Sequence, residues 1–123
     1  MRVLGVDWGE KRIGLALSEG ELAEPLGVVS SVEELIEIAR EKGVEKIILG
    51  LPEGKHRKRV EVLGVRLEEE LRIEVILRSE VLSTEAALKA AVEAGKRKKA
   101  RRELDALAAA TLLQEYLDTP ADS

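Results

Sequence analysis

Three acidic residues, Asp7, Glu80 and Asp105, are candidates for chemistry because of the segments in which they lie. Asp7 closes an apolar run in which Val3, Gly5 and Asp7 share one face of a strand, by the two-residue period of β-structure. A carboxylate on a central strand must be hydrogen-bonded, paired or bound to a cation, because burying it alone costs several kcal/mol. Asp7 therefore requires a partner.

The other two acids are placed where they can meet Asp7. Glu80 follows an apolar strand predicted over 73–77, and crossover connections bring the carboxyl ends of parallel strands to one edge of a sheet. Asp105 shares a helix face with small and apolar residues, namely Ala108, Ala109, Leu112 and Tyr116. Three converging acids with no evident basic partner repel one another unless a divalent cation offsets their charge. Acidic ligands are what a two-metal site requires, with ions about 3.5–4 Å apart.

The composition restricts which cation such a site could take. The chain has no Cys and only one His, His56, which we expect to be an exposed loop residue. Thiolate sites and sites with several histidines are therefore excluded. Any metal held by the protein must bind to oxygen, which favours Mg²⁺ or Mn²⁺.

Each acid also has a purely structural interpretation. Asp7 could cap the turn that follows it, and Glu80 could be an ordinary surface or helix-entry residue. Asp105 could pair with Arg101 or Arg102 at helical spacing. The residues alone leave these alternatives open.

Basic residues are concentrated in two runs, although the net charge of the chain is −4. The runs contain ten of the twenty basic residues and no acid: Lys55, Arg57, Lys58 and Arg59, and then Lys96, Arg97, Lys98, Lys99, Arg101 and Arg102. Such runs can bind phosphates through a locally positive field, or they can be solvated faces of a highly charged protein.

The 123 residues predict one domain over 1–118 and a flexible tail over 119–123. No apolar stretch approaches the roughly 18 residues of a membrane span, and the N-terminus lacks a signal-peptide pattern, so we expect a soluble cytoplasmic protein. The 36% of charged residues, the absence of Asn and the single Gln are typical of thermophile proteins. Whether the chain is a monomer or a homodimer stays open.

The elements that must position the acids begin with a β-meander. Strands are predicted over 2–8, 11–18 and 26–29, and Gly9 could supply a positive φ in the first turn. A helix follows, with a capping box of Ser31 and Glu34 at its start and Gly43 after its end.

Two crossovers complete the pattern. Strands are predicted over 44–51 and 73–77, a helix between them through Val60, Leu63, Leu67 and Leu71, a short helix over 84–94 and a last helix over about 98–118. This order favours an α/β, ribonuclease H-like fold, a five-stranded mixed sheet of order 3-2-1-4-5 flanked by helices.

Several motifs together resemble one family. LGVDWGEKRIGLAL (4–17) resembles the opening motif of the YqgF/RuvX family, the RuvC-like Holliday junction resolvases and pre-16S rRNA processing nucleases. ILGLP (48–52) resembles its central strand, SEVLST (79–84) its D-E-R-L-S-T motif, and LDALAAATLLQEYLD (104–118) its C-terminal helix. The resemblance covers nearly the whole chain in the right order.

This resemblance implies a function and its residues. Asp7, Glu80 and Asp105 match the acidic triad that holds the divalent metal for phosphodiester hydrolysis, and Arg12, Ser83 and Thr84 match supporting positions. The implied substrate is structured nucleic acid, either pre-16S rRNA or branched DNA such as a Holliday junction, which the two basic runs would contact.

Two departures from the family pattern bear on activity. Ser79 and Val81 replace an Asp and an Arg on either side of Glu80, and the segment 53–57 is shortened and basic. Loss of the Arg could weaken charge stabilisation in the transition state. A nucleic-acid or ribosome-associated binding module with weakened catalysis is therefore an alternative to a nuclease. A kinase-like ATPase is disfavoured because such proteins clamp nucleotide between two domains, each as large as this chain.

Overall fold

The computed structural model describes residues 1–79 and 98–119 of the chain, and for residues 98–101 the backbone alone. Some of the predicted features lie outside these residues: the short helix over 84–94, Glu80, Ser83, Thr84, Lys96, Arg97 and the tail residues 120–123. The tail residue Thr119 is described, and its hydroxyl donates to the carbonyl oxygen of Glu115 at 2.7 Å.

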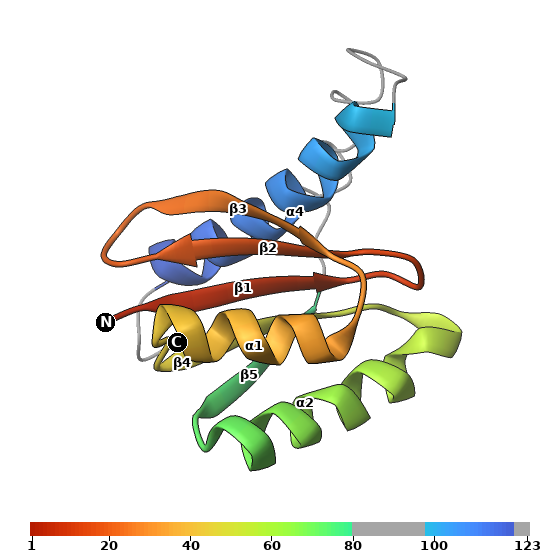
Figure 1. The fold of residues 1–123 in the computed structure, drawn as a ribbon, viewed down its shortest axis with the longest axis horizontal. Coiled ribbons are helices and arrows are strands. Elements are labelled where there is room, and N and C mark those ends of the chain that lie inside the picture. Colours follow the sequence, from red (N-terminus) through yellow and green to blue (C-terminus); the bar gives the residue numbers. More distant parts are fainter. Residues whose placement is uncertain (80–97, 120–123) are drawn as a thin grey trace.

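One five-stranded sheet forms the centre of the fold (Figure 1). Its strands are β1 (Val3–Trp8), β2 (Ile13–Ser18), β3 (Ala23–Val29), β4 (Lys46–Leu51) and β5 (Glu74–Ser79). Their order is β3-β2-β1-β4-β5, with antiparallel pairs in the meander and parallel pairs β1–β4 and β4–β5. The predicted order 3-2-1-4-5 is confirmed.

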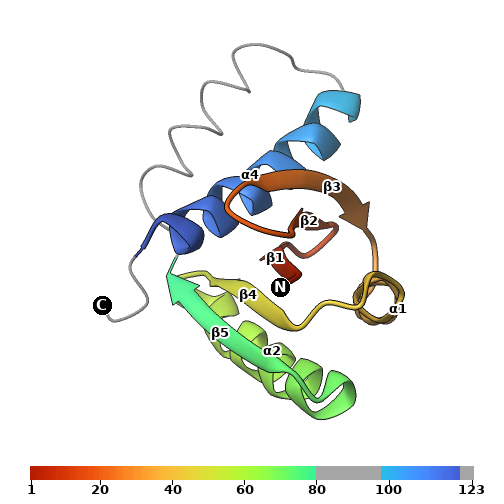
Figure 2. The same ribbon diagram turned by 90° about the vertical axis from the view of Figure 1, so that its left-hand side faces the viewer.

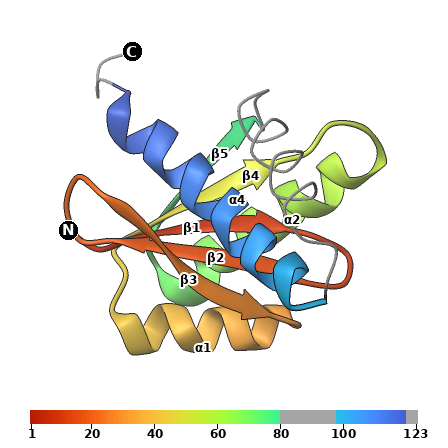
Figure 3. The same cartoon turned by 90° about the horizontal axis from the view of Figure 1, so that it is seen from above.

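Helices cover both faces of this sheet, as Figure 2 shows. The helices α1 (Val32–Lys42) and α2 (Arg57–Leu71) lie on one face, and α2 is preceded by a short 3₁₀-helix, η1 (Gly54–His56). The long helix α4 (Lys98–Asp118) crosses the other face, over β1, β2, β3 and β4 (Figure 3). The sheet therefore separates two apolar cores.

The strand alternation predicted for β1 is confirmed by these two cores. Leu4 and Val6 are fully buried in the core under α1 and α2, whereas Val3 is buried in the core under α4. Because alternate residues of a strand point to opposite faces, Asp7 lies on the face that α4 covers. The acid in the opening motif is therefore directed toward the helix that carries Asp105.

The predicted ends of α1 are also confirmed. The Ser31 hydroxyl accepts a hydrogen bond from the backbone N–H of Glu34 at 3.2 Å, and Gly43 takes the left-handed conformation with φ 62°. The Glu34 carboxylate accepts from the Ser30 hydroxyl at 2.9 Å.

The third strand is longer than the sequence predicts. It begins at Ala23, three residues before the predicted start, and contains Pro25. Proline has no N–H to donate, but β3 is an edge strand and needs no partner on its outer side. The pairing with β2 is irregular between Leu15 and Ala16, which are opposite Gly27 and Pro25, so Leu26 is an extra residue.

The role predicted for Gly9 is wrong. Positive φ values in the described chain occur at Gly27, Gly43, Gly54 and Arg72, and Gly9 is not among them. Instead, a Cβ at Gly9 would lie 2.7 Å from the carbonyl oxygen of Arg12. Gly9 therefore permits a tight turn by its small size.

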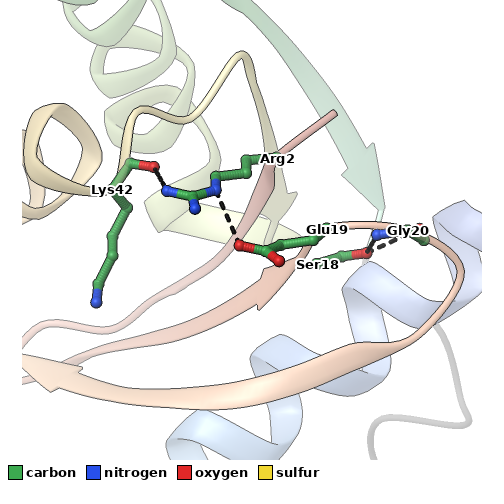
Figure 4. A network of polar contacts seen from close by, with 5 residues as sticks. All are labelled: Arg2, Ser18, Glu19, Gly20 and Lys42. Atoms are coloured by element: carbon green, nitrogen blue, oxygen red, sulfur yellow. Dashed lines mark hydrogen bonds and ion pairs between the residues drawn. The ribbon is translucent and has the colours of Figure 1, made fainter.

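The amino end of β1 is fixed by polar contacts (Figure 4). Arg2 donates to the carbonyl oxygen of Lys42 at 2.6 Å and pairs with Glu19 at 2.9 Å, and so links the end of α1 to the turn after β2. In the same turn the buried Ser18 hydroxyl donates to the Gly20 carbonyl at 2.9 Å. Asp7 and Asp105 lie at the opposite end of this strand.

Candidate functional site at the carboxyl edge of the sheet

Asp7 and Asp105 come together around one glycine. Gly14 on β2 is the strand partner of Asp7 on β1. The backbone carbonyl of Asp105 lies so close to Gly14 that a Cβ there would overlap it. The structure therefore brings together two of the three predicted acids, from opposite ends of the sequence.

A second glycine and several alanines permit this close approach of α4. A Cβ at Gly5 would lie 2.8 Å from Cβ of Leu113 and 2.9 Å from the carbonyl oxygen of Ala109. The helix face against the sheet includes several small side chains among its leucines, and Ala109 is completely buried. Small residues on both surfaces let the helix backbone lie directly on the strands, which fixes the position of Asp105 along β2.

A cation already lies beside Asp105. Nε of Arg12, at the end of the β1–β2 turn, donates to Oδ2 of Asp105 at 2.7 Å. Both side chains are about one-third exposed, at 36% and 27%. The expectation of acids with no basic partner is therefore wrong for Asp105, and among the described side chains its partner is Arg12.

The third acid, Glu80, lies outside the described residues, but the strand before it is described. Ser79 ends β5 and pairs with Leu51 at the end of β4, and β4 runs parallel to β1. The carboxyl ends of the three parallel strands therefore share the sheet edge at which Asp7 lies. No group of three or more acids or histidines that could hold a metal occurs within the part of the chain that is described.

The first basic run borders this edge. Lys55, Arg57, Lys58 and Arg59 are all exposed at η1 and the start of α2. Arg57 lies 4.0 Å from Glu61 on the same helix, a distance that makes a weak contact at most. These positive charges are therefore largely available to a ligand.

Trp8, the residue after Asp7, connects the β1–β2 turn to this basic run. The Trp8 ring lies 5.5 Å from the His56 ring, and Nε2 of His56 is 2.9 Å from a carboxylate oxygen of Glu10. The His56 side chain is only 27% exposed, so its prediction as an exposed loop residue is wrong. Sequence reasoning did not single out Trp8 or Glu10, which contact His56 at this edge. The signal available was an aromatic residue directly after the candidate acid.

The second basic run is described only in part. Arg102 is exposed and lines a groove between the amino-terminal part of α4 and β3, together with Pro25 and Leu26. The backbone of 98–101 is helical, as predicted, so Lys98, Lys99 and Arg101 belong to α4, while their side chains lie outside the description.

A polar cluster holds the other end of α4 on the sheet. Nζ of Lys46 donates to the Tyr116 hydroxyl at 3.1 Å, and this hydrogen bond raises the pKa of Lys46. Nη2 of Arg78 donates to the Thr119 hydroxyl at 2.8 Å. Burial raises the pKa of Glu115, and the charge of Arg78 opposes that effect. The helix that carries Asp105 is thus fixed to β4 and β5 as well as to β1 and β2.

The donor set at the edge fits a hard divalent cation. The described acids offer carboxylate oxygens, and the chain has no Cys and a single His, which is already paired with Glu10. Oxygen ligands of this kind suit Mg²⁺ or Mn²⁺. No helix in the described part of the chain is long and apolar enough to cross a bilayer.

Comparisons with known proteins agree with this architecture. Thermus thermophilus RuvC bound to a Holliday junction superposes with a TM-score of 0.57 and 18% identity, over 91% of this chain and 92% of that one. The fowlpox virus Holliday junction resolvase gives a TM-score of 0.60 and 14% identity, over 94% and 96%. At such identities these likenesses establish the RuvC-like, ribonuclease H-like fold.

Sequence comparison is more specific. A "Putative pre-16S rRNA nuclease" of Caldanaerobacter subterraneus subsp. tengcongensis is 37% identical over 142 aligned positions, which cover both chains completely. The family model described as "RuvX: Holliday junction resolvase" matches residues 1–119. The two acids around Gly14, the RuvC-like sheet and this match over nearly the whole chain agree, and the chain belongs to the RuvX family.

Proposed function

We propose that this protein is a metal-dependent endonuclease that hydrolyses phosphodiester bonds in structured nucleic acid in the cytoplasm, with the 5′ end of pre-16S rRNA as its substrate. The observation that carries the proposal is the meeting of Asp7 and Asp105 around Gly14, at the carboxyl edge of the parallel strands. The names of the relatives support the RNA substrate.

In this proposal Asp7, Glu80 and Asp105 hold one or two Mg²⁺ or Mn²⁺ ions. When bound, such ions would offset the charge that develops on the scissile phosphate and activate the attacking water. Close packing at Gly14 fixes Asp105 relative to Asp7, so the ligands need little reorganisation on metal binding. Ser83 and Thr84, which match supporting positions of the family, lie outside the described residues.

Arg12 has a separate role. Its guanidinium neutralises Asp105 and prevents repulsion between the two carboxylates before a cation binds. Because Arg12 is partly exposed, it can turn from Asp105 to a phosphate oxygen when the cation takes its place.

The basic runs bind the substrate backbone. The first run lies beside the proposed centre, on η1 and the start of α2: Lys55, Arg57, Lys58 and Arg59. The second run consists of Lys96, Arg97, Lys98, Lys99, Arg101 and Arg102. Each phosphate contact releases counterions, so affinity should fall steeply as salt rises.

Cleavage assays test this function. Labelled pre-16S rRNA fragments and a four-way DNA junction are incubated in parallel with Mg²⁺, Mn²⁺ or EDTA. We expect metal-dependent cleavage of the RNA, abolished by Asp7→Asn with affinity for the RNA retained. Glu37→Gln is the matched control, because Glu37 is exposed on α1, across the sheet from Asp7. Cleavage that survives Asp7→Asn would refute the assigned site.

Two other outcomes correspond to other functions. Preferential cutting of the four-way junction would make the protein a Holliday junction resolvase. Binding without cutting under every metal would indicate a nucleic-acid or ribosome-associated binding module. The Arg12–Asp105 ion pair favours this second candidate, since it satisfies one carboxylate without metal. Val81→Arg, which restores the family residue beside Glu80, would then be the first variant to assay.

A further inference from the structure

Packing against the core does not fully explain the position of the Trp8 side chain. It follows Asp7 on β1 and, by strand alternation, lies on the α2 side of the sheet. Its ring is only partly buried against the core, which leaves part of a large aromatic surface accessible at the edge where Asp7 lies. An accessible tryptophan beside a phosphodiester site is a candidate contact for a nucleobase.

The neighbours of Trp8 hold its ring and supply positive charge. His56 lies beside it at 5.5 Å between ring centroids, with the two planes tilted by 53°. Glu10 fixes His56 through the 2.9 Å contact, which links the β1–β2 turn to the start of α2. The ring therefore has a defined orientation before any ligand binds, and pre-orientation lowers the entropic cost of binding.

Arg59 stands over the same ring at a loose distance. Its guanidinium carbon is 5.8 Å from the Trp8 centroid, whereas stacked carbon groups in contact are about 3.5–4.0 Å apart. A base inserted between them would need about 7 Å, so Arg59 would have to move by roughly 1 Å. Because Arg59 is exposed, that movement is available to it.

We propose that Trp8, with Arg59 above it and His56 beside it, is a stacking site for one unpaired nucleobase of the substrate, at the same sheet edge as Asp7 but on the α2 side of the sheet. This inference rests on the proposed nuclease function and gives it a substrate class, which is a strand with an unpaired base next to the bond that is cut. Every base has a π-face, so the site selects unpaired bases with little preference among them.

The chain has a single Trp, which makes the test direct. The fluorescence of Trp8 is followed in EDTA while a single-stranded oligoribonucleotide, its deoxyribose equivalent or the fully paired RNA duplex is added. The anisotropy of a dye on the same oligonucleotides reports total binding. We expect saturable quenching by both single strands and little quenching by the duplex at equal occupancy.

Two variants that each remove one positive charge distinguish base stacking from general electrostatic attraction. Lys58→Gln and Arg59→Gln each remove one exposed cation from the same run, and of these two residues Arg59 is the one that stands over the Trp8 ring. We expect Lys58→Gln to lower affinity for single strand and duplex alike. Arg59→Gln should lower both affinities in the same way, and it should further weaken single-strand binding and reduce the quenching of Trp8. Trp8→Leu should weaken single-strand binding about tenfold, and its melting curve checks that it folds.

The outcomes distinguish this inference from the proposed function. Binding seen by anisotropy without quenching of Trp8 would overturn the stacking site and leave the nuclease proposal intact. Equal effects of Lys58→Gln and Arg59→Gln on all ligands would also overturn it. Absence of binding to every nucleic acid would overturn both. Quenching confined to unpaired strands, and reduced by Arg59→Gln, would establish the site in the wild-type protein even if Trp8→Leu does not fold.

Discussion

Replacing Gly14 by alanine should disrupt the candidate site without removing any polar group. The added Cβ would overlap the carbonyl of Asp105 and lie 3.2 Å from the backbone nitrogen of Ala106. These atoms belong to the backbone of α4, so no rotation of a side chain can relieve the overlap. The helix must move away from β2, and Asp105 must move away from Asp7.

The expected cost follows from the packing. Overfilling a well-packed core usually costs about 1–3 kcal/mol, and the upper end applies where the neighbours are rigid backbone. The helix is also packed at Gly5, where Leu113 and Ala109 leave no slack for a shift along β1. We therefore expect Gly14→Ala to lower the free energy of unfolding by about 3 kcal/mol.

Urea denaturation and a metal titration measure the two consequences. The urea concentration at the midpoint of unfolding should fall, while the dependence of the unfolding free energy on urea stays constant. This combination marks a loss of stability with the same surface exposed on unfolding. Calorimetric titration with Mn²⁺ on the folded variant should show at least tenfold weaker binding, since the carboxylates are displaced, and cleavage should fall in parallel.

Gly20→Ala is the matched control. A Cβ at Gly20 would meet no atom within 4 Å, and its backbone is not in the left-handed region. Its effect on stability should lie within about 0.5 kcal/mol. If Gly14→Ala were as stable as Gly20→Ala and bound Mn²⁺ like the wild type, the close approach of α4 at Asp105 would be refuted.

Three further predictions concern single contacts. Arg12→Gln removes the cation beside Asp105 and should strengthen Mn²⁺ binding to the free protein, as measured by calorimetry. Because the pair is partly exposed, the free energy of unfolding should fall by about 1 kcal/mol or less. Unchanged or weaker Mn²⁺ binding would contradict the counter-ion role. Ser31→Ala should lower the free energy of unfolding by about 1 kcal/mol through loss of the α1 cap, as read from urea curves against Ser31→Asn, which keeps a capping oxygen. The Tyr116 hydrogen bond raises the pKa of Lys46 above the ordinary value of 10.5. The hydrogen bond should therefore stabilise the fold fully below pH 10.5, and this stabilisation should be lost as the pH rises through the raised pKa of Lys46 in the folded protein. Unfolding curves of wild type and Tyr116→Phe should therefore converge at high pH, and a constant gap would contradict the assignment.

Local sequence patterns were enough to predict the described strands and α-helices and their order. The β-branched run before Pro52, the cap at Ser31 and the left-handed residue at Gly43 act through neighbouring residues, so a local pattern suffices to predict them. Element order and the central first strand then restrict the topology, because parallel strands need crossovers of one hand. The bulge in β3 escaped prediction, since it depends on which strand lies at the sheet edge.

Which charges meet depends instead on how distant parts of the chain pack together. Arg12 and Asp105 are 93 residues apart, and nothing in the spacing of Arg101 or Arg102 from Asp105 indicates that a turn at the other end of the chain supplies the partner. In the same way, Trp8 and His56 become neighbours only because β4, the strand that precedes η1, pairs with β1. The physical reason is that ion pairs and ring contacts act over a few ångströms in space, and such distances depend on how elements distant in sequence pack. For Arg12 and Asp105 the distance is set by the close packing of α4 on the glycines of β1 and β2.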